Sequence, residues 1–121
     1  MNNNLHGDAL INGLQIEWQP YHHQLAFKLT SLDKIPKAHG LYGLWYHKRC
    51  LYVGQAKKQI ISERLKQHWK GSHNEYLSDW ITATGSDIRI SFLIIEIQSR
   101  IDELEKYYIN KFQPVTNIQY T

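Results

Sequence analysis

Glu105 is the residue whose position points most directly to chemistry. At about 100° per residue, one face of a helix in this region consists of the apolar residues Ile101, Leu104, Tyr108, Ile109 and Phe112. Glu105 lies in the middle of that face, where a carboxylate is costly unless it is paired, hydrogen-bonded or bound to a metal. It is therefore a candidate ligand for a hard cation such as Mg²⁺, which takes one or two carboxylates and keeps several waters. The alternative is a glutamate that reaches the edge of the face and pairs with a lysine.

Arg64 and His68 are four residues apart in a second predicted helix. This spacing places two helical side chains next to each other. They border the apolar face of that helix, which Ile61, Leu65 and Trp69 form. From this border both side chains could reach into a cleft against a sheet, and the planar guanidinium of Arg64 suits phosphate oxygens. A surface arginine beside a surface histidine is the alternative.

Tyr42 and Tyr52 lie in two segments, 40–46 and 50–55, that are rich in Tyr, Leu and Val and bounded by glycine. Such segments predict a β-hairpin. If its loop holds an odd number of residues, such as 47–49, both tyrosines point to the same face of the sheet. The alternative is that they only pack, since tyrosine is common in strands.

The elements that position these residues follow from periodicity and turn residues. Alternating apolar residues predict strands around 14–18 and 25–29, joined by a turn, and a longer strand over 88–97. Helices are expected over 60–70, 75–84 and 99–112, with Ser99 and Asp102 capping the last one. Antiparallel strands with separate helices indicate an α+β fold, in which helices flank a small antiparallel sheet as in an α/β sandwich.

Length and composition indicate a single globular unit. The chain has 121 residues, of which 42% are hydrophobic and 21% charged, so disorder and two large domains are excluded. We expect this unit to span 40–121, with an N-terminal extension, 1–39, that packs on it as a β-hairpin. The longest apolar run, 92–95, is too short to span a bilayer. A single cysteine and a polar first segment predict a cytoplasmic protein.

The net charge of +3 is unevenly distributed along the chain. Residues 48–70 contain seven basic residues and one acidic residue, a net charge of +6, and the rest of the chain has a net charge of −3. A basic segment that also contains aromatic residues is expected where a protein binds a phosphate backbone. The alternative is a solvated helix face. The lysines that would contact nucleic acid are Lys57, Lys58, Lys66 and Lys70.

Taken together, these residues resemble the GIY-YIG endonuclease superfamily. Its first motif corresponds to Gly40-Leu41-Tyr42 and its second to Tyr52-Val53-Gly54. Further along the chain, the resemblance continues through Arg64, His68, Glu105 and Asn117. It covers about two-thirds of the chain. Gln55 stands where many relatives carry lysine, which counts against a lysine-assisted mechanism at this position.

The resemblance implies an endonuclease that hydrolyses phosphodiester bonds in DNA with one Mg²⁺ or Mn²⁺ per site, held by Glu105. Tyr42 would be the general base, with His68 stabilising its phenolate or accepting its proton. Arg64 would hold the scissile phosphate, Tyr52 would orient water or phosphate, and Asn117 would fix the site by hydrogen bonding.

Two other functions remain open at this point. One is a non-catalytic nucleic-acid-binding module of the same fold. The other is a nuclease selective for branched or single-stranded DNA, or for RNA. A homodimer would allow both strands of a duplex to be cut, and the sequence does not decide the oligomeric state.

Overall fold

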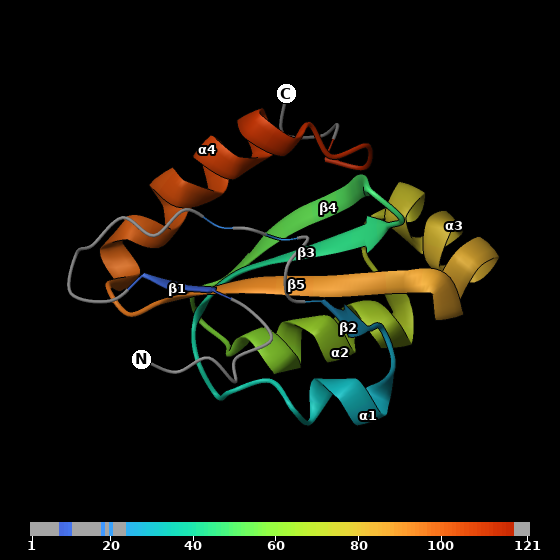
Figure 1. Cartoon of the computed structure of the whole chain (residues 1–121), viewed down its shortest axis with the longest axis horizontal. Coiled ribbons are helices and arrows are strands. Elements are labelled where there is room, and N and C mark those ends of the chain that lie inside the picture. Colours follow the sequence, from blue (N-terminus) through green and yellow to red (C-terminus); the bar gives the residue numbers. More distant parts are fainter. Residues whose placement is uncertain (1–7, 11–17, 19, 21–23, 118–121) are drawn as a thin grey trace.

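Three long strands make up most of a five-stranded sheet (Figure 1). The computed structural model describes residues 8–10, 18, 20 and 24–117, except for the side chains of 8–10 and of Ser86. The strand order is β1-β5-β3-β4, and β2 also pairs with β5. The pairing of β1 with β5 is parallel and the other pairings are antiparallel. The strands are β1 (Asp8–Leu10), β2 (Leu25–Ala26), β3 (Gly40–Tyr46), β4 (Arg49–Ala56) and β5 (Ile88–Ile95).

Helices cover both faces of this sheet (Figure 1). They are α1 (Leu29–Leu32), α2 (Ile61–Gly71), α3 (Glu75–Thr84) and α4 (Ile101–Phe112), with short 3₁₀ turns η1 (Gly85–Asp87) and η2 (Gln98–Arg100). The predicted α+β class is therefore confirmed. None of the described helices is long and apolar enough to cross a membrane.

The sheet separates two apolar cores. On one face, Leu32 of α1, Leu65 of α2 and Leu77 of α3 pack against residues of the strands, including Tyr42 and Tyr52. On the other face, α4 packs through Ile101 and Tyr108 on the remaining strand residues. This alternation follows from the two-residue period of a strand, which sends neighbouring side chains to opposite faces. It assigns the two tyrosines to the face that carries α2.

In the hairpin of β3 and β4 the two tyrosines point to the same face, as predicted, but the structural reason is a different one. The turn between the strands is formed by His47 and Lys48, with His47 in the left-handed region at φ 55°. The register then shifts between Leu44 and Trp45, where β4 contributes one extra residue as a bulge. The sequence predicted a loop with an odd number of residues, and in the structure the extra residue of the bulge has the same effect. Tyr42 pairs with Gly54, two residues from Tyr52, so both tyrosines lie on one face.

The N-terminal segment differs from the predicted hairpin where it is described. The first predicted strand, at 14–18, lies outside the described residues except for the buried Trp18. The second is reduced to β2, which pairs antiparallel with β5. At Leu29 the chain turns into α1, which buries Leu32 against the core under β3 and β5. Tertiary packing here overrides a short alternating pattern.

The predicted cap of the last helix is wrong. A 3₁₀ turn occupies 98–100, and α4 begins after Arg100 without a side-chain cap. Asp102 lies in the first turn of α4 and accepts hydrogen bonds from Lys57 and Gln55 instead. A tertiary ion pair has replaced the local bond that the spacing predicted.

The chain after α4 covers part of the outer edge of β4. The amides of Val115 and Thr116 donate to the carbonyls of Cys50 and Leu51. Asn117 then bonds both backbone groups of Val53, at 3.0 Å and 2.9 Å. The edge of β4 is therefore occupied as far as Val53, and the candidate residues gather beyond that point.

Candidate active site

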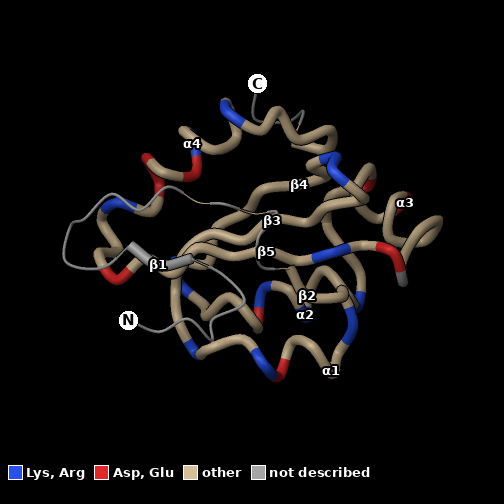
Figure 2. The backbone as a smooth tube through the Cα atoms, in the orientation of Figure 1, with Lys and Arg blue, Asp and Glu red and all other residues tan. Residues whose placement is uncertain are grey.

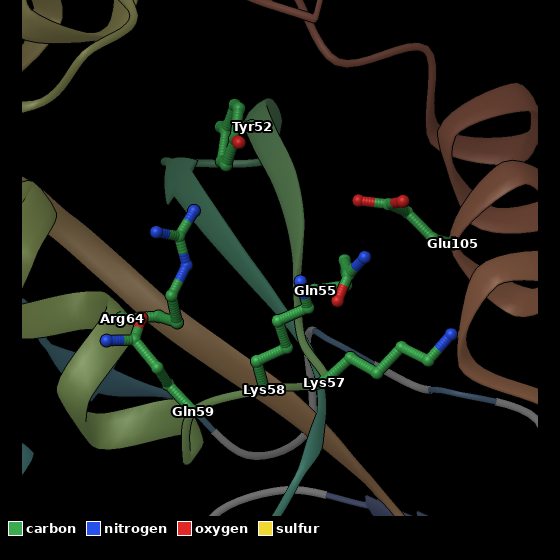
Figure 3. A pocket seen from close by; sticks show the side chains of 7 residues that line it. All are labelled: Tyr52, Gln55, Lys57, Lys58, Gln59, Arg64 and Glu105. Atoms are coloured by element: carbon green, nitrogen blue, oxygen red, sulfur yellow. The ribbon is translucent and has the colours of Figure 1, made fainter. Parts of the chain in front are cut away.

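A cavity of about 340 Å³ opens at the end of β4 (Figure 3). Arg64 enters from α2 on one side and Glu105 from α4 on the other. The rest of its lining consists of Tyr52, Gln55, Lys57, Lys58 and Gln59. Because β4 ends the strand order, helices on opposite faces of the sheet can both reach around its edge. The edge position of β4 is thus what brings Arg64 and Glu105 to one site.

Glu105 is a half-buried carboxylate facing this cavity. Burial raises its pKa to about 7, the nearby charge of Asp102 adds to the increase, and Arg64 opposes it. Among the described residues no hydrogen bond or ion pair reaches Glu105. No group of three or more His, Cys, Asp or Glu gathers around a metal position within this part of the chain. One unpaired carboxylate beside an open cavity fits an ion such as Mg²⁺, which keeps most of its waters.

Tyr42 and His68 form a buried pair behind the cavity. The side chain of Tyr42 is 0% exposed, and its hydroxyl lies 2.8 Å from Nε2 of His68. Burial, followed by the neighbouring Tyr52, raises the pKa of Tyr42 well above its usual value. Burial and the charge of Arg64 lower the pKa of His68 to about 4. At neutral pH the pair is therefore a phenol next to a neutral imidazole.

Arg64 connects this pair to the cavity. It lines the cavity, and its charge lowers the pKa of Tyr42 in opposition to burial. It also donates to Gln67 at 2.8 Å, one turn along the same helix. A guanidinium has enough N–H donors to bond Gln67 and still present further N–H groups to an anion. Tyr52, whose ring centroid lies 5.1 Å from that of His68, is the other residue shared by the buried pair and the cavity.

The two motif glycines are required by close contacts. A Cβ on Gly54 would lie 2.5 Å from the Tyr42 hydroxyl. Gly40 has φ +153°, and a Cβ there would collide with the carbonyl of Leu93. Gly54 therefore leaves the space that the Tyr42 ring occupies, and Gly40 lets β3 and β5 pair closely.

The predicted nucleic-acid-binding lysines separate into two groups. Lys57 and Lys58 line the cavity, whereas Lys66 is 3.8 Å from Asp33 beside α1. Lys70 lies near the end of α2 and is exposed. In the backbone view, acidic positions of α4 and basic positions of α2 lie on opposite sides of the sheet (Figure 2).

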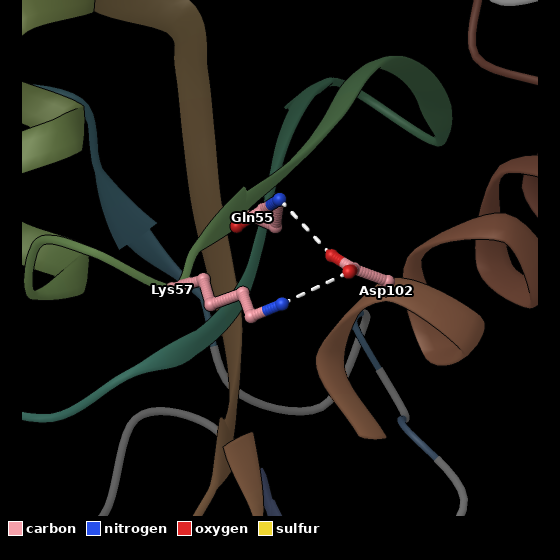
Figure 4. A network of polar contacts seen from close by, with 3 residues as sticks. All are labelled: Gln55, Lys57 and Asp102. Carbon is pink, nitrogen blue, oxygen red and sulfur yellow. Dashed lines mark hydrogen bonds and ion pairs between the residues drawn. The ribbon is translucent and has the colours of Figure 1, made fainter. Parts of the chain in front are cut away.

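Asp102 forms a polar contact at the mouth of the cavity (Figure 4). One carboxylate oxygen accepts from Lys57 at 3.0 Å and the other accepts from Gln55 at 3.3 Å. This contact ties α4 to the end of β4 next to Glu105. The role of Asp102 was missed by sequence reasoning, which assigned it to a helix cap.

Ser72 and Asn74 were also missed. Ser72 lies 2.9 Å from Nδ1 of His68, and Asn74 caps α3 while reaching the carbonyl of Thr116. An asparagine directly before a predicted helix is a recognised cap signal, so Asn74 could have been found. Ser72 has no such local signal.

Comparison with known families gives one result. The model of the GIY-YIG catalytic domain matches residues 38–119. No curated protein and no solved structure gives a significant match to this chain. The matched region includes both tyrosines, Arg64, His68, Glu105 and Asn117.

Proposed function

This chain belongs to the GIY-YIG family, and from that premise we propose that it is an endonuclease that depends on Mg²⁺ or Mn²⁺ and hydrolyses phosphodiester bonds in DNA. One observation carries the proposal: Arg64 and Glu105 come from helices on opposite faces of the sheet and line one cavity, with Tyr52 between them. A guanidinium and an unpaired carboxylate around one cavity suit a phosphate that binds together with a divalent ion.

The basic side chains of the cavity would hold the substrate. The planar fork of Arg64 can bond two oxygens of the scissile phosphate. Lys58 lines the same cavity and makes no ion pair among the described residues, so it is available to a neighbouring phosphate. Contacts to phosphate position a duplex without reading its bases. We therefore expect cleavage with little sequence preference.

Tyr42 would act as the base that activates water. As its oxygen takes a proton from the water that attacks phosphorus, its own proton would pass to Nε2 of His68. The bond from phosphorus to the leaving oxygen breaks, the leaving oxygen takes a proton from solvent, and His68 returns its extra proton to solvent. Arg64 favours the phenolate through its charge, in opposition to burial.

Glu105 would hold the divalent ion. A bound Mg²⁺ or Mn²⁺ would neutralise charge on the phosphate and support the leaving oxygen. Binding requires the ionised carboxylate, and the pKa of Glu105 is raised to about 7, so ion binding would release a proton near neutral pH.

A nucleic-acid-binding module without catalysis is the second candidate. The observation that favours it is the complete burial of Tyr42, which does not line the cavity. In such a module the Tyr42–His68 pair would only support the fold. It would bind nucleic acid in a salt-sensitive way and would not cleave it.

The deciding experiment is a cleavage panel. Supercoiled, single-stranded and branched DNA and an RNA would be incubated with Mg²⁺, Mn²⁺ or a chelator. We expect nicking of supercoiled DNA with either ion and none with chelator. Glu105→Gln should lose cleavage at least 100-fold while DNA binding is retained. Its matched control is Glu103→Gln, an exposed position on the same helix.

Three outcomes would change the proposal. Binding by the wild type without turnover under either ion would establish the second candidate. Full activity of Glu105→Gln would refute the metal role of Glu105. Faster cleavage of branched DNA, single-stranded DNA or RNA would identify that nucleic acid, in place of duplex DNA, as the substrate.

A further inference from the structure

Ser72 contacts the ring nitrogen of His68 that faces away from Tyr42. Its Oγ lies 2.9 Å from Nδ1 of His68 and also accepts a hydrogen bond from the backbone amide of Asn74 at 3.2 Å. Ser72 follows the last residue of α2, one turn beyond His68. The two ring nitrogens of His68 are therefore both engaged, one by Tyr42 and the other by Ser72.

The neighbours of Tyr42 decide where the single proton of the neutral imidazole resides. Among the described residues, the hydrogen-bond partner of the Tyr42 hydroxyl is Nε2 of His68. If His68 donated from Nε2 to the Tyr42 oxygen, the buried hydroxyl proton of Tyr42 would have no acceptor among the described residues, which is costly. With the proton on Nδ1, Tyr42 donates to Nε2 and His68 donates to Ser72. The hydroxyl proton of Tyr42 and both ring nitrogens of His68 then have partners.

We propose that Ser72 is a positioning residue that fixes His68 in the Nδ1–H tautomer and so leaves the Nε2 lone pair facing the Tyr42 hydroxyl. The inference deepens the proposed function, because that lone pair is what would accept the Tyr42 proton. Ser72 is not a residue of the cavity lining and has no hydrogen bond to Tyr42, so its effect on Tyr42 is exerted through His68. A tautomer set by a hydrogen bond on the far ring nitrogen is a recognised way of orienting histidine.

Asn74 holds Ser72 in place. Its side-chain oxygen accepts from the Leu77 amide at 3.1 Å, which caps α3, and its side-chain amide donates to the Thr116 carbonyl at 2.6 Å. Asn74 is buried, at 6% exposure. The link between α2 and α3 is thus tied to the segment that carries Asn117. The orientation of His68 consequently depends on two helices and the edge of β4 together.

Nitrogen NMR of the ¹⁵N-histidine-labelled protein tests the tautomer directly and requires no activity. In the wild type we expect a protonated Nδ1 and an unprotonated Nε2 on His68 at pH 7. Ser72→Ala should shift the population toward Nε2–H, and Ser72→Thr, which keeps the hydroxyl, should restore the wild-type signals. An Nε2–H tautomer in the wild type, or no change in Ser72→Ala, would overturn the proposal.

Kinetics then tests what the tautomer does. We expect Ser72→Ala to lower kcat about tenfold, the effect of losing one hydrogen bond of ordinary strength, with KM unchanged. Ser72→Thr should recover kcat. Ser78→Ala, at another partly exposed serine nearby on α3, is the matched control and should retain wild-type kcat. A shifted tautomer with unchanged kcat would refute the positioning role, and a wild type without any turnover would instead refute the proposed function.

Discussion

The hydroxyl of Tyr42 lies 2.8 Å from Nε2 of His68, and both side chains are buried. This contact joins the central strand β3 to α2 across a distance of 26 residues in the sequence. It keeps a phenol and a neutral imidazole together at the back of a cavity that holds Arg64 and Glu105. Burial of the pair also raises the pKa of Tyr42 and lowers the pKa of His68.

Acid should destabilise the protein through His68. Its pKa is about 4 in the folded chain and about 6.5 when unfolded. The neutral form is favoured by folding, so this stabilisation is complete above pH 6.5 and is lost as the pH falls toward 4. The loss amounts to about 3 kcal/mol. Urea unfolding between pH 7 and pH 4 should show this dependence in the wild type and a flatter one in His68→Gln.

The control for this measurement is His47→Asn, because His47 is exposed at the hairpin turn and asparagine tolerates its positive φ. This variant should keep the dependence of the wild type on pH. Equal slopes for the wild type and His68→Gln would mean that the buried imidazole does not remain neutral.

Glu105 should have the opposite effect on stability: its contribution is lost as the pH rises. Its pKa is raised to about 7 in the folded protein, so its contribution is present below pH 4.5 and is lost as the pH rises through 7. Glu105→Gln cannot ionise and should therefore raise the free energy of unfolding by about 1 to 3 kcal/mol at pH 8, with partial solvent screening included. At pH 4 the two proteins should be equally stable. Thermal unfolding without divalent ions at both pH values measures this difference, and an unchanged Tm of Glu105→Gln at pH 8 would contradict the prediction.

Removing the carboxylate of Asp102 should strengthen binding to duplex DNA. Lys57 loses its partner at 3.0 Å and becomes available to a phosphate. In Asp102→Asn the slope of log Kd against log salt should steepen by about 0.9, the value for one further phosphate contact. Fluorescence anisotropy at several salt concentrations measures the slope. Asp79→Asn, at an exposed acid on α3, changes the net charge equally and should leave the slope unaltered.

Two glycine-to-alanine substitutions should have opposite effects. In Gly54→Ala the new Cβ would lie 2.5 Å from the Tyr42 hydroxyl, and the displacement this forces should cost about 1 to 3 kcal/mol. Gly71 lies in the last turn of α2 with no atom within 4 Å of a Cβ, so Gly71→Ala should stabilise the protein by about 0.5 to 1 kcal/mol. Urea unfolding compares the two, and a stable Gly54→Ala variant would show that Tyr42 can move away from β4.

Much of the fold could be predicted from local patterns. The boundaries of α3 match the prediction and those of α2 differ by one residue at each end, because apolar periodicity is a local property. The predicted cap of Ser99 with Asp102 was wrong because a capping motif is also a local pattern and contains no information about residues outside its own helix. Lys57, 45 residues away, binds the Asp102 carboxylate instead. The spacing of residues within one element does not predict long-range partners of this kind.

The sequence by itself determined which side chains are candidates for chemistry, among them Arg64 in the helix that is α2 and Glu105 in the helix that is α4. Only the tertiary structure decided that Arg64 and Glu105 meet in one cavity while Tyr42 and His68 are enclosed behind it. The physical reason is that β4 lies at the end of the strand order, so helices on opposite faces reach around its edge. Burial, which depends on every neighbouring element, then raised the pKa of Tyr42 and of Glu105 and lowered that of His68.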